Sequence, residues 1–275
     1  MMKPVITLSY IFLCMCLLVG ACKNPVVQPT VTGFTYTDEK NLGNELHKAM
    51  VNSTMFDVLD ASGTYATAYQ YLSGLRVKIL ATNIMERRQD FDWTFHIIKN
   101  DGIQDCFTTV GGKIYITTGL LRDLVANEAQ LLGVLAHEMY YADESYQMQI
   151  IKDNYNFTEI LNVVYGGEEG TALEMISWFY NTPRNANLVP QADQYGATIL
   201  CGIGQVSIKE FGKVIENAAL TTPTSRWYTN HPSPSTSSVN DRKQEMVTQQ
   251  ATCNTSTINV YQQRYLDFLN NLPPR

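Results

Sequence analysis

The sequence of 275 residues has little positive charge, and no cluster of Lys or Arg stands out in it. Its 20 Lys and Arg are outnumbered by 26 Asp and Glu, which gives a formal net charge of −6. Nucleic-acid binding depends on basic side chains that neutralise phosphates, so this balance argues against such a partner. The three Trp are scattered and form no base-stacking pattern. We therefore expect no nucleic acid to bind.

Paired metal-binding cysteines and internal repeats are also missing. None of the six Cys shows C-x-x-C spacing, so a cysteine zinc site is not expected. Cys106, Cys201 and Cys253 lie outside the N-terminal segment, and in an oxidising compartment they predict one disulfide and one spare thiol. The pairing stays open. No boundary divides the chain after the first few dozen residues, which predicts a single domain over residues 38–275.

The N-terminal apolar run is too short for a comfortable membrane span. It covers residues 5–19, follows Lys3 and ends in Gly20-Ala21-Cys22, so residues 1–22 are predicted to be a signal peptide. The small residues before Cys22 resemble the lipobox of bacterial lipoproteins, in which the Cys is acylated and becomes the mature N-terminus. This predicts a protein of the bacterial cell envelope, periplasmic or surface-exposed, attached to the membrane by an N-terminal lipid. A plain secretory signal and an uncleaved anchor remain the alternatives. Residues 23–37, rich in Pro, Val and Thr, are predicted to be a tether.

Hydrophobic periodicity predicts a mostly helical domain with a few strands. The expected helices cover residues 38–50, 64–87, 127–146, most of 153–180, 190–200, 208–219, 241–250 and 260–269. The expected strands cover residues 91–98, 106–110 and 113–117, with a hairpin turn at Gly111-Gly112. Gly166-Gly167 interrupts one helix, and the adjacent Glu168 and Glu169 are predicted to be a solvated loop, with oxygen ligands for a cation as the alternative.

The most informative stretch is residues 127–146, NEAQLLGVLAHEMYYADESY. Its apolar residues recur at helical spacing, so one face of the helix is expected to be buried. His137 and Glu138 follow the most apolar turn. In zinc peptidases, H-E-x-x-H places two imidazoles on one helix face, and the Glu is the general base for a zinc-bound water. Here the position of the second His is occupied by Tyr141.

Four features in order resemble the zinc metalloendopeptidase family of HtpX and the CaaX prenyl proteases, metallopeptidase family forty-eight of the gluzincin type. They are GGKIYITTGLL at residues 111–121, LLGVLAHE at 131–138, QADQYGATIL at 191–200 and His231-Pro232. The third looks like the helix that carries the E-x-x-x-D signature of the family. The resemblance implies an α+β fold: a mostly helical zincin-like domain with a small antiparallel sheet beside the His137-Glu138 helix.

The departures from the family pattern decide the functional prediction. The resemblance places the three zinc ligands at His137, Tyr141 and Val189. A phenol with a pKa near 10 is a poor zinc ligand, and an isopropyl group is none. Zinc lowers the pKa of its bound water from about 15.7 to about 7, so without the metal Glu138 would have no activated water to serve. The sequence therefore predicts a pseudoenzyme without zinc, and residual metal binding is the alternative.

The residues that the family pattern retains have structural interpretations. His137 and Glu138 are expected to be relics that hydrogen bonds satisfy, with Tyr141 as a donor to Glu138. Asp193 resembles the family residue that orients a ligand His, and here it is expected to brace His137 or to cap a helix. His231 is expected to be an exposed loop residue before a turn Pro, with a replacement metal ligand as the alternative.

Three functions remain in competition. The first is a binding or scaffold lipoprotein whose old cleft holds a peptide or a protein, by strand addition. The second is an active zinc metalloendopeptidase with an altered site, built from His137 and His231 with Glu174 or Asp193. The third is a structural envelope component without a functional groove, which a cleft filled by its own side chains would favour.

Overall fold

The computed structural model describes residues 33–221, 225–253 and 259–275. The chain divides into two compact units, Met1–Gly33 and Phe34–Arg275, and the second contains every element named below. The predicted signal peptide, Cys22 and the predicted tether up to residue 32 lie outside the described residues. Within the described ranges, no helix has both the length and the apolar character that a membrane crossing requires.

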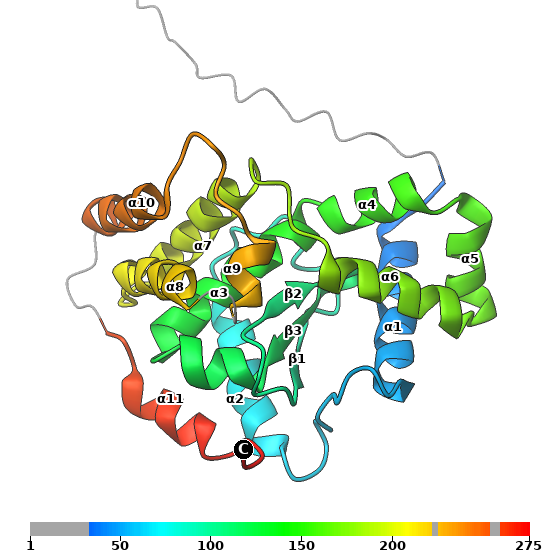
Figure 1. Ribbon diagram of the computed structural model, residues 1–275, viewed down its shortest axis with the longest axis horizontal. Helices are drawn as coiled ribbons and strands as arrows, with labels where there is room; N and C mark the ends of the chain where they lie inside the picture. The colour runs from blue at the N-terminus through cyan, green and yellow to red at the C-terminus, as the bar shows by residue number, and fades with distance from the viewer. Residues whose placement is uncertain (1–32, 222–224, 254–258) are drawn as a thin grey trace, which may run out of the picture. The chain divides into compact units, whose positions relative to one another are not determined.

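Helices make up most of the domain, and they surround a small sheet (Figure 1). The expected mostly helical α+β domain is confirmed. The helices are α1 (Tyr36–Asn52), α2 (Ala66–Leu80), α3 (Glu128–Asp143), α4 (Tyr146–Asn154), α5 (Phe157–Gly166), α6 (Glu169–Asn181), α7 (Val189–Ile203), α8 (Ile208–Leu220), α9 (Arg226–Asn230), α10 (Val239–Thr252) and α11 (Gln262–Leu269).

The sheet has the strand order β1-β3-β2, with β1 at Thr94–Ile98, β2 at Cys106–Thr108 and β3 at Lys113–Thr117. The predicted hairpin joins β2 and β3 as antiparallel neighbours, with Phe107 opposite Tyr115. However, β1 pairs with β3 in parallel, so the sheet is mixed and not purely antiparallel as expected. A parallel neighbour needs a crossover connection, which local sequence patterns do not reveal.

The turn between β2 and β3 depends on its glycines. Gly111 and Gly112 have φ of 70° and 78°, in the left-handed region that other residues rarely adopt. A Cβ on Gly111 would lie 2.9 Å from the backbone oxygen of Glu39 on α1. The turn therefore also lets α1 pack directly on the sheet, and it places Glu39 in the interior.

Helix α3 lies at the centre of the domain, and all of its residues are buried. Its amino end is capped by Asn127, whose side chain accepts a hydrogen bond from the backbone N–H of Gln130. Gly133 allows α8 to approach, because a Cβ there would lie 2.5 Å from Phe211. The helix ends at Asp143 and not at residue 146. Asp143 accepts bonds from two backbone N–H groups of the α2–β1 connection, and Ser145 adopts a left-handed conformation.

Several other boundaries differ from the prediction for local reasons. The helix expected to run to residue 87 ends at Leu80, and Asn83 then has a positive φ. The region predicted as one interrupted helix from residue 153 is instead α4, α5 and α6, with α4 beginning at Tyr146. A capping box at Asn156 starts α5, and left-handed Gly167 ends it. The segment between the predicted helices of residues 208–219 and 241–250 contains the short helix α9.

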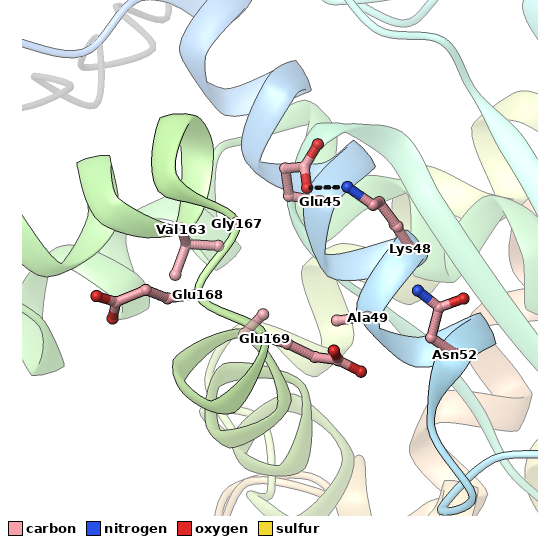
Figure 2. Close-up of a pocket in the computed structure, with 9 residues that line it drawn as sticks. Glu45, Lys48, Ala49, Asn52, Val163, Gly167, Glu168 and Glu169 are labelled. Atoms are coloured by element: carbon pink, nitrogen blue, oxygen red, sulfur yellow. Dashed lines mark hydrogen bonds and ion pairs between the residues drawn. The ribbon is translucent and has the colours of Figure 1, made fainter.

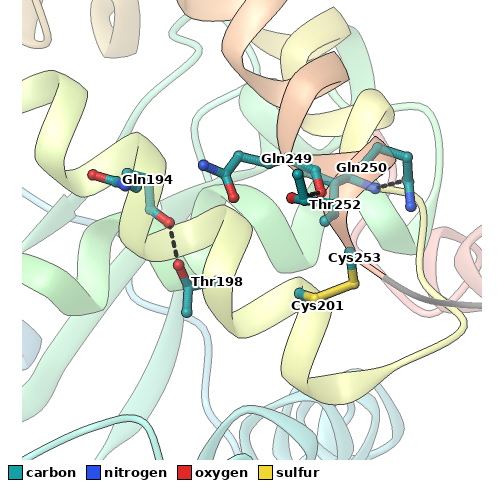
Figure 3. The surroundings of a disulfide bond; sticks show 8 residues. Gln194, Thr198, Cys201, Gln249, Gln250, Thr252 and Cys253 are labelled. Atoms are coloured by element: carbon teal, nitrogen blue, oxygen red, sulfur yellow. Dashed lines mark hydrogen bonds between the residues drawn. A yellow bond between two sulfur atoms is a disulfide. The ribbon is translucent and has the colours of Figure 1, made fainter. Parts of the chain in front are cut away.

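One disulfide and one free thiol are present among the described cysteines, as predicted. Cys201 and Cys253 form the bond, with their Cα atoms 5.6 Å apart, and Cys106 is free and buried. Figure 3 shows that the bond joins the last turn of α7 to the residue that follows α10. It therefore links two helices that both contribute to the buried cluster described below.

Glu39 is a buried acid that should make stability depend on pH. Burial raises its pKa from 4.5 to about 7, and Arg87 and Ser145 only partly offset this. Because the folded pKa exceeds the unfolded one, Glu39 should cost stability progressively as the pH rises from 4.5 to about 7. Urea unfolding should show Glu39→Gln stabilised relative to the parent by up to about 3 kcal/mol at pH 8, with the gain vanishing near pH 4. An equal gain at both values would contradict this account.

Candidate functional site

His137 and Glu138 lie at the centre of a buried polar cluster between four helices. Both project from α3, and the other members are Asp193 on α7, His231 directly after α9, and Arg242 on α10. None of these five side chains is more than 3% exposed. Polar groups so deeply buried must satisfy one another, because water does not reach them.

One half of the cluster is a chain of charged groups that fixes His137. Nδ1 of His137 lies 2.9 Å from Oδ1 of Asp193. Arg242 donates to the same carboxylate from Nε at 2.6 Å and from Nη2 at 3.1 Å. Burial alone would raise the pKa of Asp193, but Arg242 and His137 outweigh it and lower that pKa to about 2. Because Asp193 accepts, Nδ1 of His137 carries the proton, and in the neutral imidazole Nε2 is then the acceptor.

Tyr141 lies beside Nε2 of His137, the ring nitrogen that Asp193 does not contact. Its hydroxyl lies 3.4 Å from Nε2, the nitrogen that would have to bind a metal. Burial raises the pKa of Tyr141 well above its ordinary value, so it stays a neutral phenol and a hydrogen-bond donor. The sequence had suggested that Tyr141 donates to Glu138. The structure instead directs it to His137.

The other half of the cluster satisfies Glu138. Trp227 on α9 donates from Nε1 to Oε1 at 3.0 Å. The hydroxyl of Thr108 on β2 lies 2.8 Å from the carbonyl oxygen of Glu138 and 3.1 Å from Oε2, so these two oxygens share one donor. His231 Nε2 also lies 3.0 Å from Oε1, although it is not aligned as a hydrogen bond. Burial raises the pKa of Glu138, but the two imidazoles and Arg184 outweigh it and lower that pKa to about 2. Glu138 is therefore a carboxylate whose Oε1 is bonded to Trp227 and whose Oε2 lies within reach of Thr108.

The expectation of an exposed His231 is wrong. His231 is 1% exposed, its Nδ1 lies 2.7 Å from the carbonyl oxygen of Trp227, and its own carbonyl accepts from Arg242 at 3.2 Å. The physical reason is the short helix α9. It turns Trp227 inward, and His231, the residue directly after the helix, is carried into the interior with it. Sequence reasoning missed Trp227 and Thr108. No local motif marks either residue, because both contacts depend on tertiary packing.

The other predicted positions are accounted for as follows. Val189 is fully buried and begins α7, one helical turn before Asp193, so it offers an apolar side chain where the family pattern has a ligand. Glu174 is exposed on α6 and does not join the buried cluster. Asp193 is committed to His137 and Arg242.

The acidic pair beside Gly167 does not form a set of converging ligands. Glu168 and Glu169 are exposed and line a cavity of about 40 Å³ between α1 and the start of α6. Figure 2 shows their carboxylates pointing in opposite directions, while Glu45 pairs with Lys48 at 3.3 Å. The oxygen-ligand alternative therefore has no geometric support at this pair.

His137, Glu138 and His231 are the only group of three or more His, Cys, Asp or Glu residues in the described part of the chain whose ligand atoms approach closely, within 4.8 Å. A catalytic zinc needs three protein ligands and an open position for water. This group reaches three only by using Glu138, the base, as a ligand, and its carboxylate is already engaged. Tyr141 also faces the binding nitrogen of His137. The donor set therefore does not fit a catalytic zinc.

Comparison with known proteins identifies the family. The family model described as Peptidase family M48 matches residues 76–236, which is 161 of 275 residues and more than half of the chain. A search of the curated proteins found no match. The matched region contains β1 to α9, and with them His137, Glu138, Asp193 and His231. The chain belongs to peptidase family M48.

Proposed function

We propose that this protein is a catalytically inactive, metallopeptidase-like lipoprotein of the bacterial cell envelope that binds no zinc and serves as a scaffold. The observation that carries the proposal is the position of Tyr141, whose hydroxyl lies 3.4 Å from His137 Nε2 where a ligand of the metal is needed. Val189 removes a second ligand. On this proposal His137 and Glu138 are vestigial, and they stabilise the fold instead of acting on a substrate.

A scaffold is favoured over a peptide-binding groove by the covering of β2. All three residues of this edge strand are buried. The carbonyl oxygen of Thr108 accepts from Nε2 of Gln147 on α4 at 2.8 Å, so a backbone group at the free edge is already bonded. Strand addition needs an exposed edge with unpaired groups. The side chains of Trp227 and His231 further fill the space around Glu138.

The anchoring part of the proposal rests on the sequence. Residues 1–22 have the pattern of a signal peptide that ends at a lipobox-like Cys22. We propose that the lipid on Cys22 attaches the protein to the membrane, with other envelope proteins as partners of the scaffold.

An active peptidase with an altered site is the second candidate. The group of His137, Glu138 and His231 within 4.8 Å favours it. On this alternative, Trp227 and Thr108 release Glu138, and the segment around α9 moves out to admit a substrate.

Assaying cleavage of an unstructured protein separates the two candidates. We expect the parent to show no cleavage that a chelator abolishes, and Glu138→Gln to behave identically, because no metal-bound water is available. Metal analysis of the protein purified without added metal should find far less than one zinc per chain. Chelator-sensitive cleavage that Glu138→Gln abolishes would overturn the proposal and establish the peptidase.

A further inference from the structure

Exposed aromatic side chains lie on α5 and beside the start of α1. Among the large hydrophobic residues that are exposed in the described ranges, the aromatic ones are Tyr36, Phe157 and Tyr165, at 46%, 50% and 69%. Tyr36 lies beside Phe91 and Arg87, whereas the ring of Phe34 lies 4.8 Å from that of Phe157. We call Phe34, Phe157 and Tyr165 the aromatic face. Exposed aromatic groups that cluster in this way mark an interaction surface more often than scattered aliphatic residues do.

Contacts between α1 and α5 hold this face together. Phe157 and Tyr165 lie eight residues apart on α5 and so share one side of that helix. Phe34 packs on Phe157 at the start of α5, and the hydroxyl of Tyr165 donates to Asp38 at 2.9 Å near its end. The first turn of α1 therefore lies along α5 at one end of the domain (Figure 1).

The chain itself identifies what should cover the face. Residues 23–33, eleven residues, separate Cys22 from Phe34. Even a fully extended segment of that length spans at most about 40 Å. On the proposed anchoring, which this inference requires, the lipid on Cys22 keeps the start of α1 within about 40 Å of the membrane. Phe34, the first residue of the domain, is a member of the aromatic face.

We infer that the aromatic face contacts the surface of a zwitterionic phospholipid bilayer and fixes the orientation of the anchored domain. Tyr rings have an apolar body and a polar tip, which suits the depth of the lipid headgroups. Lys152 Nζ lies over the Phe34 ring at 5.7 Å, where it can reach a lipid phosphate. Asp38, which is bonded to Tyr165, and Glu159, two residues after Phe157 on α5, disfavour a strongly anionic surface.

A fluorescent label on α5 tests the contact. The lipidated protein is bound to phosphatidylcholine vesicles that carry a doxyl quencher near the headgroups, with the label at Thr158→Cys, beside Phe157. The control label is Gln263→Cys on α11, at the opposite end of the ribbon (Figure 1). Both positions are exposed, and native Cys106 is buried while Cys201 and Cys253 are bonded, so labelling is selective. We expect quenching to be severalfold greater at residue 158 than at residue 263.

Matched substitutions complete the experiment. Phe157→Ser with Tyr165→Ser should reduce quenching at residue 158 to the level of the control label, whereas Leu220→Ser, at a 77% exposed position on α8, should not. Equal quenching at both labels on vesicle-bound protein would overturn the inference. So would shielding of the label at residue 158 that needs no lipid and grows with protein concentration, because a second copy of the chain would then cover the face. Failure of the anchoring proposal is seen separately, because unlipidated protein would lack the acyl mass and would not sediment with vesicles.

Discussion

Restoring both lost ligand positions, by Tyr141→His with Val189→Glu, should produce a protein that takes up about one equivalent of zinc. His137 already has the Nδ1 partner that metal-bound imidazoles require, since Asp193 accepts at 2.9 Å. Replacing the phenol frees Nε2 and adds a second imidazole one turn along the same helix face. Residue 189 begins α7, one turn before Asp193, and a carboxylate there completes the set of three zinc ligands. Metal analysis after dialysis is the measurement.

The double variant should bind zinc much more tightly than its controls. Each single variant, and the double variant carrying His137→Ala, should bind zinc at least about 100-fold more weakly, because loss of even a supporting residue typically costs 10- to 100-fold. Saturating zinc should raise the free energy of unfolding of the double variant alone, by about 4 kcal/mol at 1,000 times Kd. A folded double variant that takes up no zinc would show that the site is closed by more than these two residues. Stoichiometric zinc in the parent would refute the pseudoenzyme proposal.

Arg242→Met should destabilise the protein by about 3–5 kcal/mol, because it leaves the Asp193 carboxylate buried without its counter-charge. Arg242 makes two bonds to Asp193 and one to the carbonyl of His231, so its loss also frees the segment after α9. Urea unfolding at neutral pH measures the difference. Arg275→Met is a suitable control, since that guanidinium is 60% exposed and its partner Asp123 is itself partly exposed.

The companion substitution distinguishes a coupled pair from a packing effect. Asp193→Asn with Arg242→Met removes both charges, and it should cost less than the sum of the two single substitutions, because neither charge is left uncompensated. Strict additivity would mean that Arg242 stabilises the domain mainly through the packing of its side chain.

Much of the fold follows from local sequence patterns, but the pairing of the strands does not. The apolar spacing of residues 131–139 predicts α3, although the helix ends three residues earlier than expected, and β3 covers the residues predicted for it. The parallel partnership of β1 with β3 joins segments that are not consecutive strands, so no local signal encodes it. Helix α9 was missed because it has only five residues, and so short a helix depends on tertiary contacts.

The candidate site, like the fold, is only partly predictable from local sequence patterns. Spacing on a single helix brings His137 and Tyr141 together, and alignment with the family pattern points to Asp193 and Val189. By contrast, the partners of Glu138 come from β2 and α9, which are distant in sequence, and only the folded chain brings them to the carboxylate. The exposure predicted for His231 failed for the same reason. Its surroundings are set by Trp227 and Arg242.

The bond from Trp227 to Glu138 gives the molecule a built-in optical probe. An indole held against an ionised carboxylate, 1% exposed, has emission that responds strongly to the loss of that neighbour and to the entry of solvent. The other two indoles lie elsewhere, Trp93 bonded to the carbonyl of Arg87 and Trp178 on α6. Intrinsic fluorescence can therefore follow any loosening of the segment around α9 in real time, without an attached dye.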